Sequence, residues 1–400
     1  MDCESKNPID EMTILKVKTD KTIINFQREA YCLFGLPVDN LTLAAVKTLI
    51  RQRAPSKENI VLSTININWV ARSFSDPEFR SAILNSDLVT LDGKPLVWLS
   101  NFLGYPMRET VPGSTLIQEL LEEDHEIPLT IFLFGGDGEA AELAKERINK
   151  RRGGLRAIGA LNPGYDTVEE MSCDKIIDAI NRASPDILLV ALGARKGAQW
   201  IEKNRHQLTA GVISHLGATI NFLAGTVQRA PRFMQQLGLE WLWRIFQEPK
   251  LFSRYAEDGM VIIRRLLGKP VLWIKYLLLQ KKYRQTSIDT DVDINEMSNE
   301  LHLSFGKKLC LNTDSDFRKL FEGIASGGKD VVFDFRQTEF VDGRFIGHLL
   351  ILGKQLEKQG QQLRITNFNA QLNDVFRFYD YPGILDQAKT AETTTENSSK

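Results

Sequence analysis

Four short apolar segments, each leading into helical sequence, constrain the fold of this chain more than any other feature. They read NIVLSTINI at 59–67, LTIFLFGG at 129–136, DILLVALG at 186–193 and AGVISHLGA at 210–218, with a shorter run, DLVTLDG, at 87–93. Strands that are apolar throughout are typical of a parallel sheet covered by helices on both faces. A strong helix is predicted at 139–151, another at 41–53, and a short strand at 13–17. The sequence therefore predicts an α/β domain built on a parallel sheet.

The last quarter of the chain predicts a second, smaller domain. The polar stretch QTSIDTDVDINEMSNE at 285–300 is expected to be a linker. After it, short apolar runs such as DVVFDF and QLRITNF alternate with helical patterns. We therefore expect the first domain over 1–258, a small α/β domain over 300–388, and a tail at 389–400 that is disordered by composition.

Composition excludes several classes of protein. The 400 residues carry 50 Lys and Arg against 51 Asp and Glu, so a basic coat for nucleic acid is excluded and no nucleic-acid partner is expected. The polar N-terminal sequence has no apolar core of a signal peptide. The cysteines are scattered, without a CxxC pair, and so predict neither a disulfide framework nor a metal site and fit a reducing cytoplasm. They are Cys3, Cys32, Cys173 and Cys310.

A basic, apolar segment at 259–288 contains seven cations and no acidic residue. Its longest uninterrupted run of apolar residues is too short to span a bilayer. Aliphatic bulk with closely spaced cations favours an amphipathic segment that docks on an anionic membrane surface. The alternative is a packed helix pair with a solvated basic face, broken at Gly268-Lys269-Pro270. The residues expected at the membrane are Arg264, Arg265, Lys269, Trp273, Lys275, Lys281 and Lys282.

Polar and glycine residues follow the predicted strands, where ligands of α/β sheets usually bind. Asp92 ends one strand and is placed to accept a proton from a substrate hydroxyl, or instead to cap the helix that begins near Pro95. The glycine cluster GGDG at 135–138 opens a helix and could receive a diphosphate, although a tight turn needs glycine in any case.

The segment 225–255 combines arginines with tryptophans in the sequence GTVQRAPRFMQQLGLEWLWRIFQEPKLFSRY. A helical core stripe accounts for the aromatic residues, and solvated helix faces account for some of the charges. The turn RAP followed by LEWLWR nevertheless indicates arginines held for an anionic ligand.

The run from about Asn59 to Tyr255 resembles the WecG/TagA/CpsF family of bacterial glycosyltransferases. The matching motifs are TIN, DPEFR, LVTLDGKPLVW, FLFGG, NPGY, PDILLVALG, GATINFLAGTVQRAP and LGLEWLWRIFQEP, in order and at natural spacing. The resemblance implies a Rossmann-like domain and an inverting, metal-independent transferase without a cofactor. Its donor would be a UDP-linked N-acetylmannosamine-type sugar, or a related hexose or uronic acid. Its acceptor would be a polyprenyl-diphosphate-linked GlcNAc, used in surface polysaccharide synthesis at the cytoplasmic face of the inner membrane.

Carried over to this chain, the resemblance assigns Asp92 as general base, with Thr64 and Asn66 as its companions. Residues expected at the substrates are Gly93, Gly113, Gly135, Gly136, Asn162, Tyr165, Gly193, Arg195, Gln199, Asn221, Arg229, Arg232 and Arg244. Four family positions differ: Gln and Glu are replaced by Gly197 and Ala198, and Arg and Asp by Thr110 and Thr115. A family member with weakened or no catalysis, binding lipid carrier or nucleotide-sugar as a scaffold, is therefore the alternative function.

The C-terminal domain resembles a STAS domain through VVFDFRQTEFVDGRFIGHLLILGKQLEKQGQQLRITNF at 331–368. Signalling members of that family carry a phosphorylated serine after the aspartate of a turn. Here the turn reads Asp342-Gly343-Arg344, without a hydroxyl group, so we expect a protein-docking module without a phosphoswitch. The alternative is an appendage that only packs on the enzyme.

Overall fold

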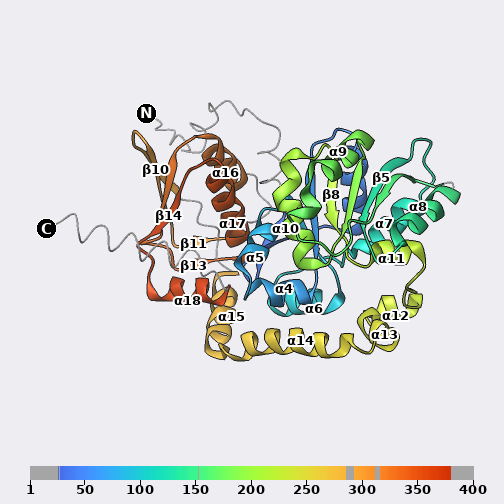
Figure 1. The fold of residues 1–400 in the computed structure, drawn as a ribbon. Helices are drawn as coiled ribbons and strands as arrows, with labels where there is room; N and C mark the ends of the chain where they lie inside the picture. Colours follow the sequence, from blue (N-terminus) through green and yellow to red (C-terminus); the bar gives the residue numbers. More distant parts are fainter. Residues whose placement is uncertain (1–25, 27, 152, 285–291, 311–315, 380–400) are drawn as a thin grey trace. The chain divides into compact units, whose positions relative to one another are not determined.

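The structure is a computed structural model of the 400-residue chain and describes residues 26, 28–151, 153–284, 292–310 and 316–379. The strand expected at 13–17 and the tail at 389–400 lie outside the described residues. The chain forms two compact units (Figure 1). The first unit comprises 39–264, and the second combines 1–38 with 265–400.

A six-stranded, all-parallel sheet forms the centre of the first unit (Figure 1). Its strands lie in the order β4-β3-β8-β7-β5-β6. They are β3 (Ile60–Ile65), β4 (Leu88–Leu91), β5 (Leu129–Gly135), β6 (Leu155–Leu161), β7 (Ile187–Ala191) and β8 (Val212–His215). The α/β prediction is confirmed, and five strands occupy the predicted apolar segments. The edge strand β6 was missed because its sequence, LRAIGAL, includes a charged residue and a glycine.

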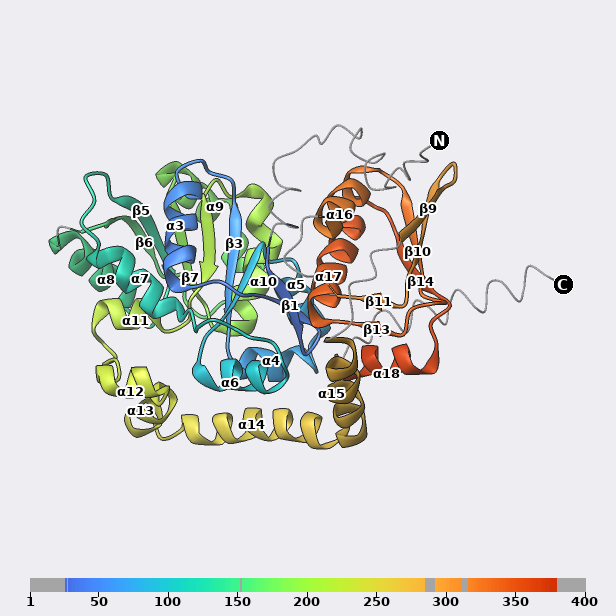
Figure 2. The same ribbon diagram turned by 180° about the vertical axis from the view of Figure 1, so that it is seen from behind.

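Helices cover both faces of this sheet, which explains why its strands are apolar throughout (Figures 1 and 2). The helices α3 (Leu43–Arg53), α7 (Gly113–Glu122), α8 (Ala140–Lys150) and α11 (Thr219–Ala224) pack on one face, and α9 (Asp174–Ala183) and α10 (Ala194–Asn204) on the other. Alternate residues of β5 enter the two cores: Ile131 and Leu133 the first, Phe132 and Phe134 the second.

The remaining helices of the first unit begin near the carboxyl edge of the sheet or follow its last strand. They are α4 (Ile67–Ser73), α5 (Pro77–Leu84), α6 (Lys94–Phe102), α12 (Arg232–Leu237), α13 (Glu240–Gln247) and most of α14 (Leu251–Leu267). Since α4, α6 and α10 follow β3, β4 and β7 directly, their N-terminal ends lie at this edge, where α/β proteins bind ligands.

The second unit has a four-stranded mixed sheet in the order β14-β12-β10-β9. Its elements are β9 (Val292–Glu296), β10 (Glu300–Phe305), β11 (Lys308–Leu309), α16 (Asp316–Ser326), β12 (Asp330–Asp334), β13 (Phe340–Val341), α17 (Gly343–Lys358), β14 (Leu363–Thr366) and α18 (Ala370–Phe378). The linker prediction for 285–300 is wrong at β9, which pairs antiparallel with β10. The strand buries Val292 and exposes its polar residues, and such an amphipathic edge strand has the composition of a linker.

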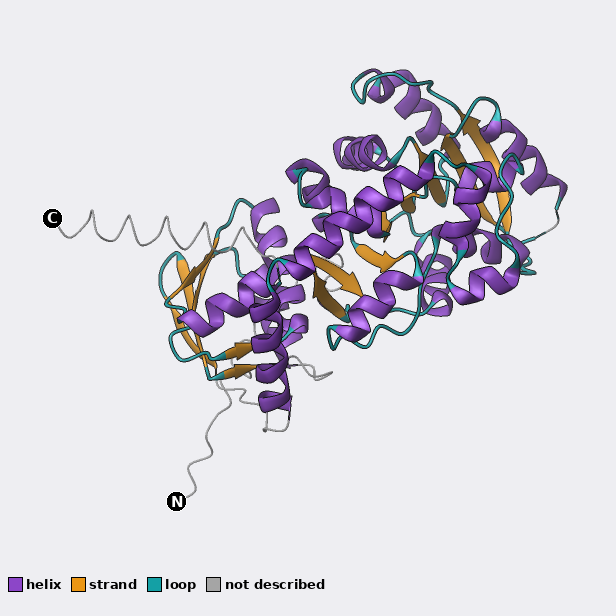
Figure 3. Cartoon of the chain, turned by 90° about the horizontal axis from the view of Figure 1, so that it is seen from below, coloured by secondary structure: helices purple, strands orange, loops and turns teal. Residues whose placement is uncertain are grey.

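Two further elements complete the second unit. The hairpin of β1 (Ala30–Leu33) and β2 (Leu36–Asp39), which the sequence analysis missed, lies almost wholly in it. The helix α15 (Pro270–Arg284) begins after the predicted break and packs on α18, where the rings of Tyr276 and Phe378 stack with centroids 4.0 Å apart. Figure 3 shows the strands of each sheet with their covering helices. Over the described part of the chain, no helix is long and apolar enough to cross a membrane.

Candidate active site at the carboxyl edge of the parallel sheet

Asp92 lies at the carboxyl end of β4. Its backbone N–H donates to the carbonyl of Ile65 at the end of the neighbouring strand β3, with 2.7 Å between nitrogen and oxygen. The next residue, Gly93, has a φ of +108° and is the N-cap of α6, with no side-chain capping hydrogen bond. The alternative that Asp92 caps this helix is therefore wrong, and its carboxylate is available for another role.

The carboxyl group of Asp92 is unusually basic. Burial, together with the nearby carboxylate of Glu240, raises its pKa to about 7, whereas the charges of Arg244 and Arg229 lower it. A carboxylate with a pKa close to neutral can hold or release a proton under physiological conditions, which suits acid–base chemistry. The segment 225–255 thus supplies charged groups near Asp92.

The two arginines differ in how they are held. Arg229 donates to the hydroxyl of Thr115 on α7 at 2.8 Å and lies 3.8 Å from Glu240. Arg244 lies over the ring of Phe222, with its guanidinium carbon 5.9 Å from the centroid. The Nε atoms of both arginines are buried without a hydrogen-bond partner. Half-buried guanidinium groups with an unused, buried Nε donor are suited to an anionic ligand.

Thr64 and Asn66 occupy neighbouring positions around the end of β3. Thr64 is buried and lies in register with Thr90 of β4, whose hydroxyl is buried without a partner. The side chain of Asn66 accepts from the backbone N–H of Trp69 and so caps α4. Asn66 therefore has a clear structural role, whatever else it contacts.

The glycine-rich loop after β5 meets two other expected site residues. Asn221 on α11 donates to the carboxylate of Asp137 at 2.6 Å, and Asn162 donates to the carbonyl of Gly138 at 2.6 Å. Gly135 has a φ of +99°, and a Cβ there would lie 2.4 Å from the carbonyl oxygen of Ala191, so the strands require glycine. Tyr165 is 85% exposed.

The other predicted glycines lie at helix starts or in close packing. Gly136, in the same loop, has a φ of +94°, and a Cβ there would come within 2.9 Å of Ile220. Gly113 begins α7, where a Cβ would lie 2.2 Å from Leu216. Gly193 caps α10 with a φ of +79° and open space around it. Arg232 begins α12, but its side chain lies outside the described residues.

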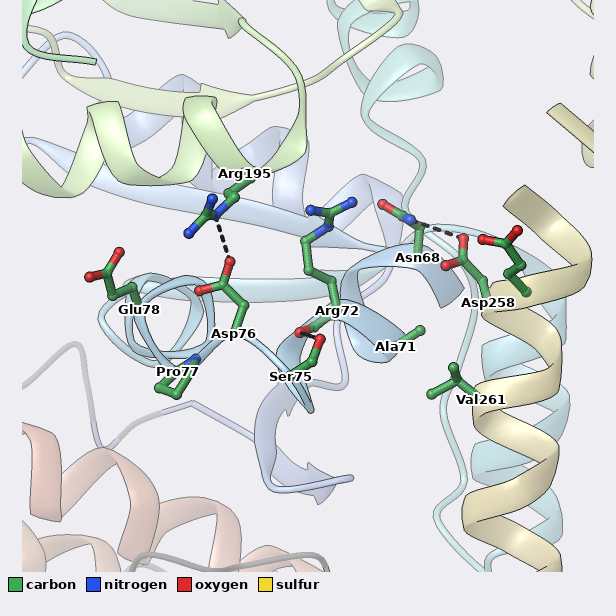
Figure 4. Close-up of a pocket in the computed structure, with 11 residues that line it drawn as sticks. Asn68, Ala71, Arg72, Ser75, Asp76, Pro77, Glu78, Arg195, Asp258 and Val261 are labelled. Atoms are coloured by element: carbon green, nitrogen blue, oxygen red, sulfur yellow. Dashed lines mark hydrogen bonds and ion pairs between the residues drawn. The ribbon is translucent and has the colours of Figure 1, made fainter. Parts of the chain in front are cut away.

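Arg195 and Gln199 have partners at the start of α5. Arg195 forms an ion pair of 2.7 Å with Asp76, the N-cap of α5, and Gln199 donates to Glu78 at 2.9 Å. Figure 4 shows Arg195 at the wall of a polar cavity of about 770 Å³. The residues lining it are Asn68, Ala71, Arg72, Ser75, Asp76, Pro77, Glu78, Arg195, Glu257, Asp258 and Val261. The side chains of these two residues thus pair with acidic residues at the start of α5.

His215 at the end of β8 is a site residue that the sequence analysis missed. Its ring is buried, with its centroid 5.5 Å from that of Trp69. Burial lowers its pKa to about 4, opposed in part by the backbone of Gly193 and of His215 itself, and neither ring nitrogen makes a hydrogen bond of normal geometry. The available signal was a lone histidine at the carboxyl end of an apolar strand.

Comparison with known proteins identifies the family of this chain. Residues 31–274, more than half of the chain, match the glycosyl transferase WecG/TagA/CpsF family. The chain belongs to this family. Residues 291–396 match the STAS domain. The protein is therefore a glycosyltransferase with a STAS domain, and we call the first unit the transferase unit and the second the STAS unit.

Two relatives come from Staphylococcus aureus strains MW2 and NCTC 8325 / PS 47. Each is 25% identical to this chain over 226 residues, which is 56% of this chain and 86% of the relative. Both are named N-acetylglucosaminyldiphosphoundecaprenol N-acetyl-beta-D-mannosaminyltransferase. These names describe transferases that act on a lipid-linked sugar.

The structure explains two departures of this transferase from the family pattern. Gly197, in place of the family's Gln, lies against His215, so a Cβ at this position would come within 1.9 Å of the ring. The imidazole thus occupies space that the family's longer side chain would need. Thr115, in place of the family's Asp, still accepts a hydrogen bond from Arg229. Gly197 therefore has the imidazole of His215 beside it, and Thr115 has the guanidinium of Arg229.

Proposed function

We propose that this protein transfers an N-acetylmannosamine-type sugar, or a related hexose or uronic acid, from a UDP donor to a polyprenyl-diphosphate-linked saccharide. The reaction would invert the configuration at the anomeric carbon and belong to surface polysaccharide synthesis. The observation that carries the proposal is Asp92, a carboxylate with a pKa of about 7 between cationic groups at the ligand-binding edge of the sheet. The names of the relatives support the lipid-linked acceptor.

In the proposed step, the ionised carboxylate of Asp92 removes the proton from the acceptor hydroxyl. The hydroxyl oxygen attacks the anomeric carbon from the side opposite the nucleotide, and the bond from this carbon to the diphosphate oxygen breaks. UDP leaves with the bonding electron pair, and the proton stays on Asp92 until solvent removes it. One base is sufficient for this chemistry, since inversion needs no covalent intermediate.

The leaving diphosphate would be stabilised by positive charge instead of a bound metal. Arg229 and Arg244 both interact electrostatically with Asp92, and each has a buried Nε donor without a hydrogen-bond partner. The N-terminal end of α10, capped by Gly193 with no side chain over it, offers backbone N–H groups at the same edge. Such preorganised donors stabilise charge that develops in the transition state.

Transfer itself is the test of this proposal. Purified protein would be offered a panel of UDP-sugars with a polyprenyl-diphosphate-GlcNAc acceptor, in the presence of a chelator. We expect product with at least one donor, and a loss of about 10²–10⁴-fold in Asp92→Asn, the range for removal of a general base. The matched control is Asp178→Asn, an exposed aspartate on α9, which should retain wild-type activity.

The alternative, a scaffold without catalysis, predicts a different result. It is favoured by Gly197 and Ala198, where the family pattern has Gln and Glu. In that case UDP-sugar would bind to wild type and to Asp92→Asn alike, and neither protein would form product. That outcome would contradict the proposed reaction and leave a binding function.

We further propose that the protein works as a peripheral protein at the cytoplasmic face of the inner membrane, through the segment 259–288. Exposed apolar side chains follow helical spacing on both helices of this segment, at Met260, Ile263 and Leu267 on α14 and at Val271, Ile274 and Leu278 on α15. Arg264 and Lys281 are exposed beside them. On each helix, an apolar stripe with a cation beside it suits an anionic bilayer surface.

Other predicted membrane residues contact the STAS unit's own elements. Lys275 forms an ion pair of 2.7 Å with Asp374, Lys282 donates to the hydroxyl of Tyr283, and Lys269 donates to the carbonyl of Arg377. Trp273 packs edge-on against Phe378. Arg265 is not without an interaction partner either, so we do not count it among the residues proposed to dock. The residues proposed to dock are therefore the apolar stripe of each helix, with Arg264 on α14 and Lys281 on α15, instead of the whole basic run.

Vesicle flotation tests this docking surface. We expect the double variant Ile274→Asp/Leu278→Asp to lose most of its binding to vesicles of anionic phospholipid, because two charges would have to enter the acyl boundary. The matched control is Ile127→Asp in the transferase unit, where the side chain is 84% exposed outside the segment. Equal flotation of the double variant and the wild type would refute the docking role.

A further inference from the structure

The helix α17 is buried on almost every side. Eight consecutive residues, 345–352, are buried, whereas a helix that covers one face of a sheet normally buries only one stripe. Toward the sheet, the ring of Phe345 packs among those of Phe305 and Phe321, each with a centroid 5.8 Å away. The opposite face of α17 must therefore be covered by something outside the STAS fold proper.

The cover is the N-terminal segment of the same chain. The guanidinium of Arg344 donates from Nε to the hydroxyl of Tyr31 at 2.7 Å and from an Nη to Glu29 at 3.2 Å. Its central carbon lies 4.9 Å from the centroid of the Tyr31 ring. One turn further along, Nε2 of His348 lies 3.0 Å from the carbonyl oxygen of Arg28. Each polar group of this face thus has a partner on one extended segment.

Gly347 shows how closely the segment approaches the helix. A Cβ at this position would lie 2.8 Å from the carbonyl oxygen of Ala30 and 3.1 Å from a backbone carbon of Tyr31. Glycine inside a helix costs about 1 kcal/mol relative to alanine, so its presence here calls for a reason. The close approach of the β1 backbone supplies that reason.

We propose that the face of α17 formed by Arg344, Gly347 and His348 is a peptide-docking surface, and that residues 28–34 of the same chain are its occupant. Arg344 recognises a carboxylate and a tyrosine two positions apart, which lie on the same side of an extended strand. The glycine admits the strand backbone. A partner protein that uses this face must present the same pattern and displace the N-terminal segment.

Alkylation of Cys32 in the full-length protein tests whether the segment is held by this face. Cys32 lies in β1 and is fully buried, whereas Cys173 in the transferase unit is exposed and serves as the reagent control. Mass spectrometry of peptides distinguishes the two thiols. We expect Gly347→Ala to accelerate the reaction of Cys32 by about tenfold or more, since the added methyl group collides with the strand backbone.

Gly353→Ala is the matched control, because it adds the same methyl group to the same helix with no contact closer than 3.7 Å. It should leave the reaction of Cys32 within about twofold of wild type, while any gain in helix propensity is shared by both variants. Hydrogen exchange in β12 would report whether the STAS core remains folded. Equal reactivity of Cys32 in wild type and Gly347→Ala, with an intact core, would overturn the proposal.

A second variant tests docking from the segment side and leaves the helix unchanged. Glu29→Arg places two guanidinium groups opposite each other and should release the segment. A labelled peptide of residues 26–39 should then bind Glu29→Arg at least about tenfold more tightly than wild type, a difference typical of one charge-assisted hydrogen bond. Equal binding to both proteins, or none to either, would show that this face does not recognise the segment.

Discussion

Buried polar groups lack hydrogen-bond partners at the carboxyl edge of the transferase sheet, whereas those on the covered face of α17 have them. At the sheet edge, the hydroxyl of Thr90, the ring nitrogens of His215 and Nε of Arg244 are buried without partners. On α17, Arg344 and His348 both have partners at hydrogen-bonding distance. Unpaired buried groups cost stability and are expected where a ligand completes the site. This difference is the one expected between a proposed substrate site and an interface that is already formed.

The largest effect on stability is expected at the completed interface. Arg344→Ala removes two charge-assisted hydrogen bonds and the contact with the Tyr31 ring, and should lower the free energy of unfolding of the STAS unit by about 2 kcal/mol. Denaturant unfolding followed by fluorescence would measure this change. Transferase activity should be retained, and the exposed Arg336→Ala serves as control. A loss below about 0.5 kcal/mol, no more than an ordinary surface substitution, would remove the contrast between the two regions.

A smaller effect on stability, with a large effect on activity, is expected at the sheet edge. Arg244 has no hydrogen bond from its Nε, so Arg244→Ala should change the free energy of unfolding by less than about 0.5 kcal/mol. Transfer should fall by roughly 10- to 100-fold, because the proposed reaction would lose a cation that stabilises the leaving diphosphate. The pKa of Asp92 should also rise, since Arg244 lowers it.

The control for this second comparison is Arg254→Ala, an exposed arginine on α14. It should leave both the rate and the free energy of unfolding unchanged. If Arg244→Ala destabilised the protein as much as Arg344→Ala did, its role would be structural, and the two regions would not differ in the way described above.

The central features of the transferase unit could be predicted from sequence because they depend on local pattern. Strands buried on both faces leave continuous apolar runs, and the turn Asp92-Gly93 follows one of them. The arginines of 225–255 were conspicuous by their density among aromatic residues. The family resemblance then assigned Asp92 a role that its surroundings support, although spacing alone left helix capping open.

The features that were missed depend on contacts between segments far apart in the chain. His215, at the end of β8, fits beside the site only because Gly197 on α10 leaves space for its ring. The hairpin of β1 and β2 is short, and its partner α17 lies more than 300 residues away. Arg195 and Gln199 lie on α10, the helix that follows β7, but their side chains pair with acidic residues at the start of α5, whose position no local pattern reveals.

The pH dependence of sugar transfer tests the account most directly. If Asp92, with its pKa of about 7, is the general base, it must be ionised to act. The value of kcat/KM should therefore rise with pH through about 7 and be about tenfold below its plateau at one pH unit below that midpoint. Asp92→Asn should lose this limb together with the activity. A profile that is flat from about pH 5.5 to 8.5, or a limb that persists in Asp92→Asn, would contradict the assignment of Asp92 as the base.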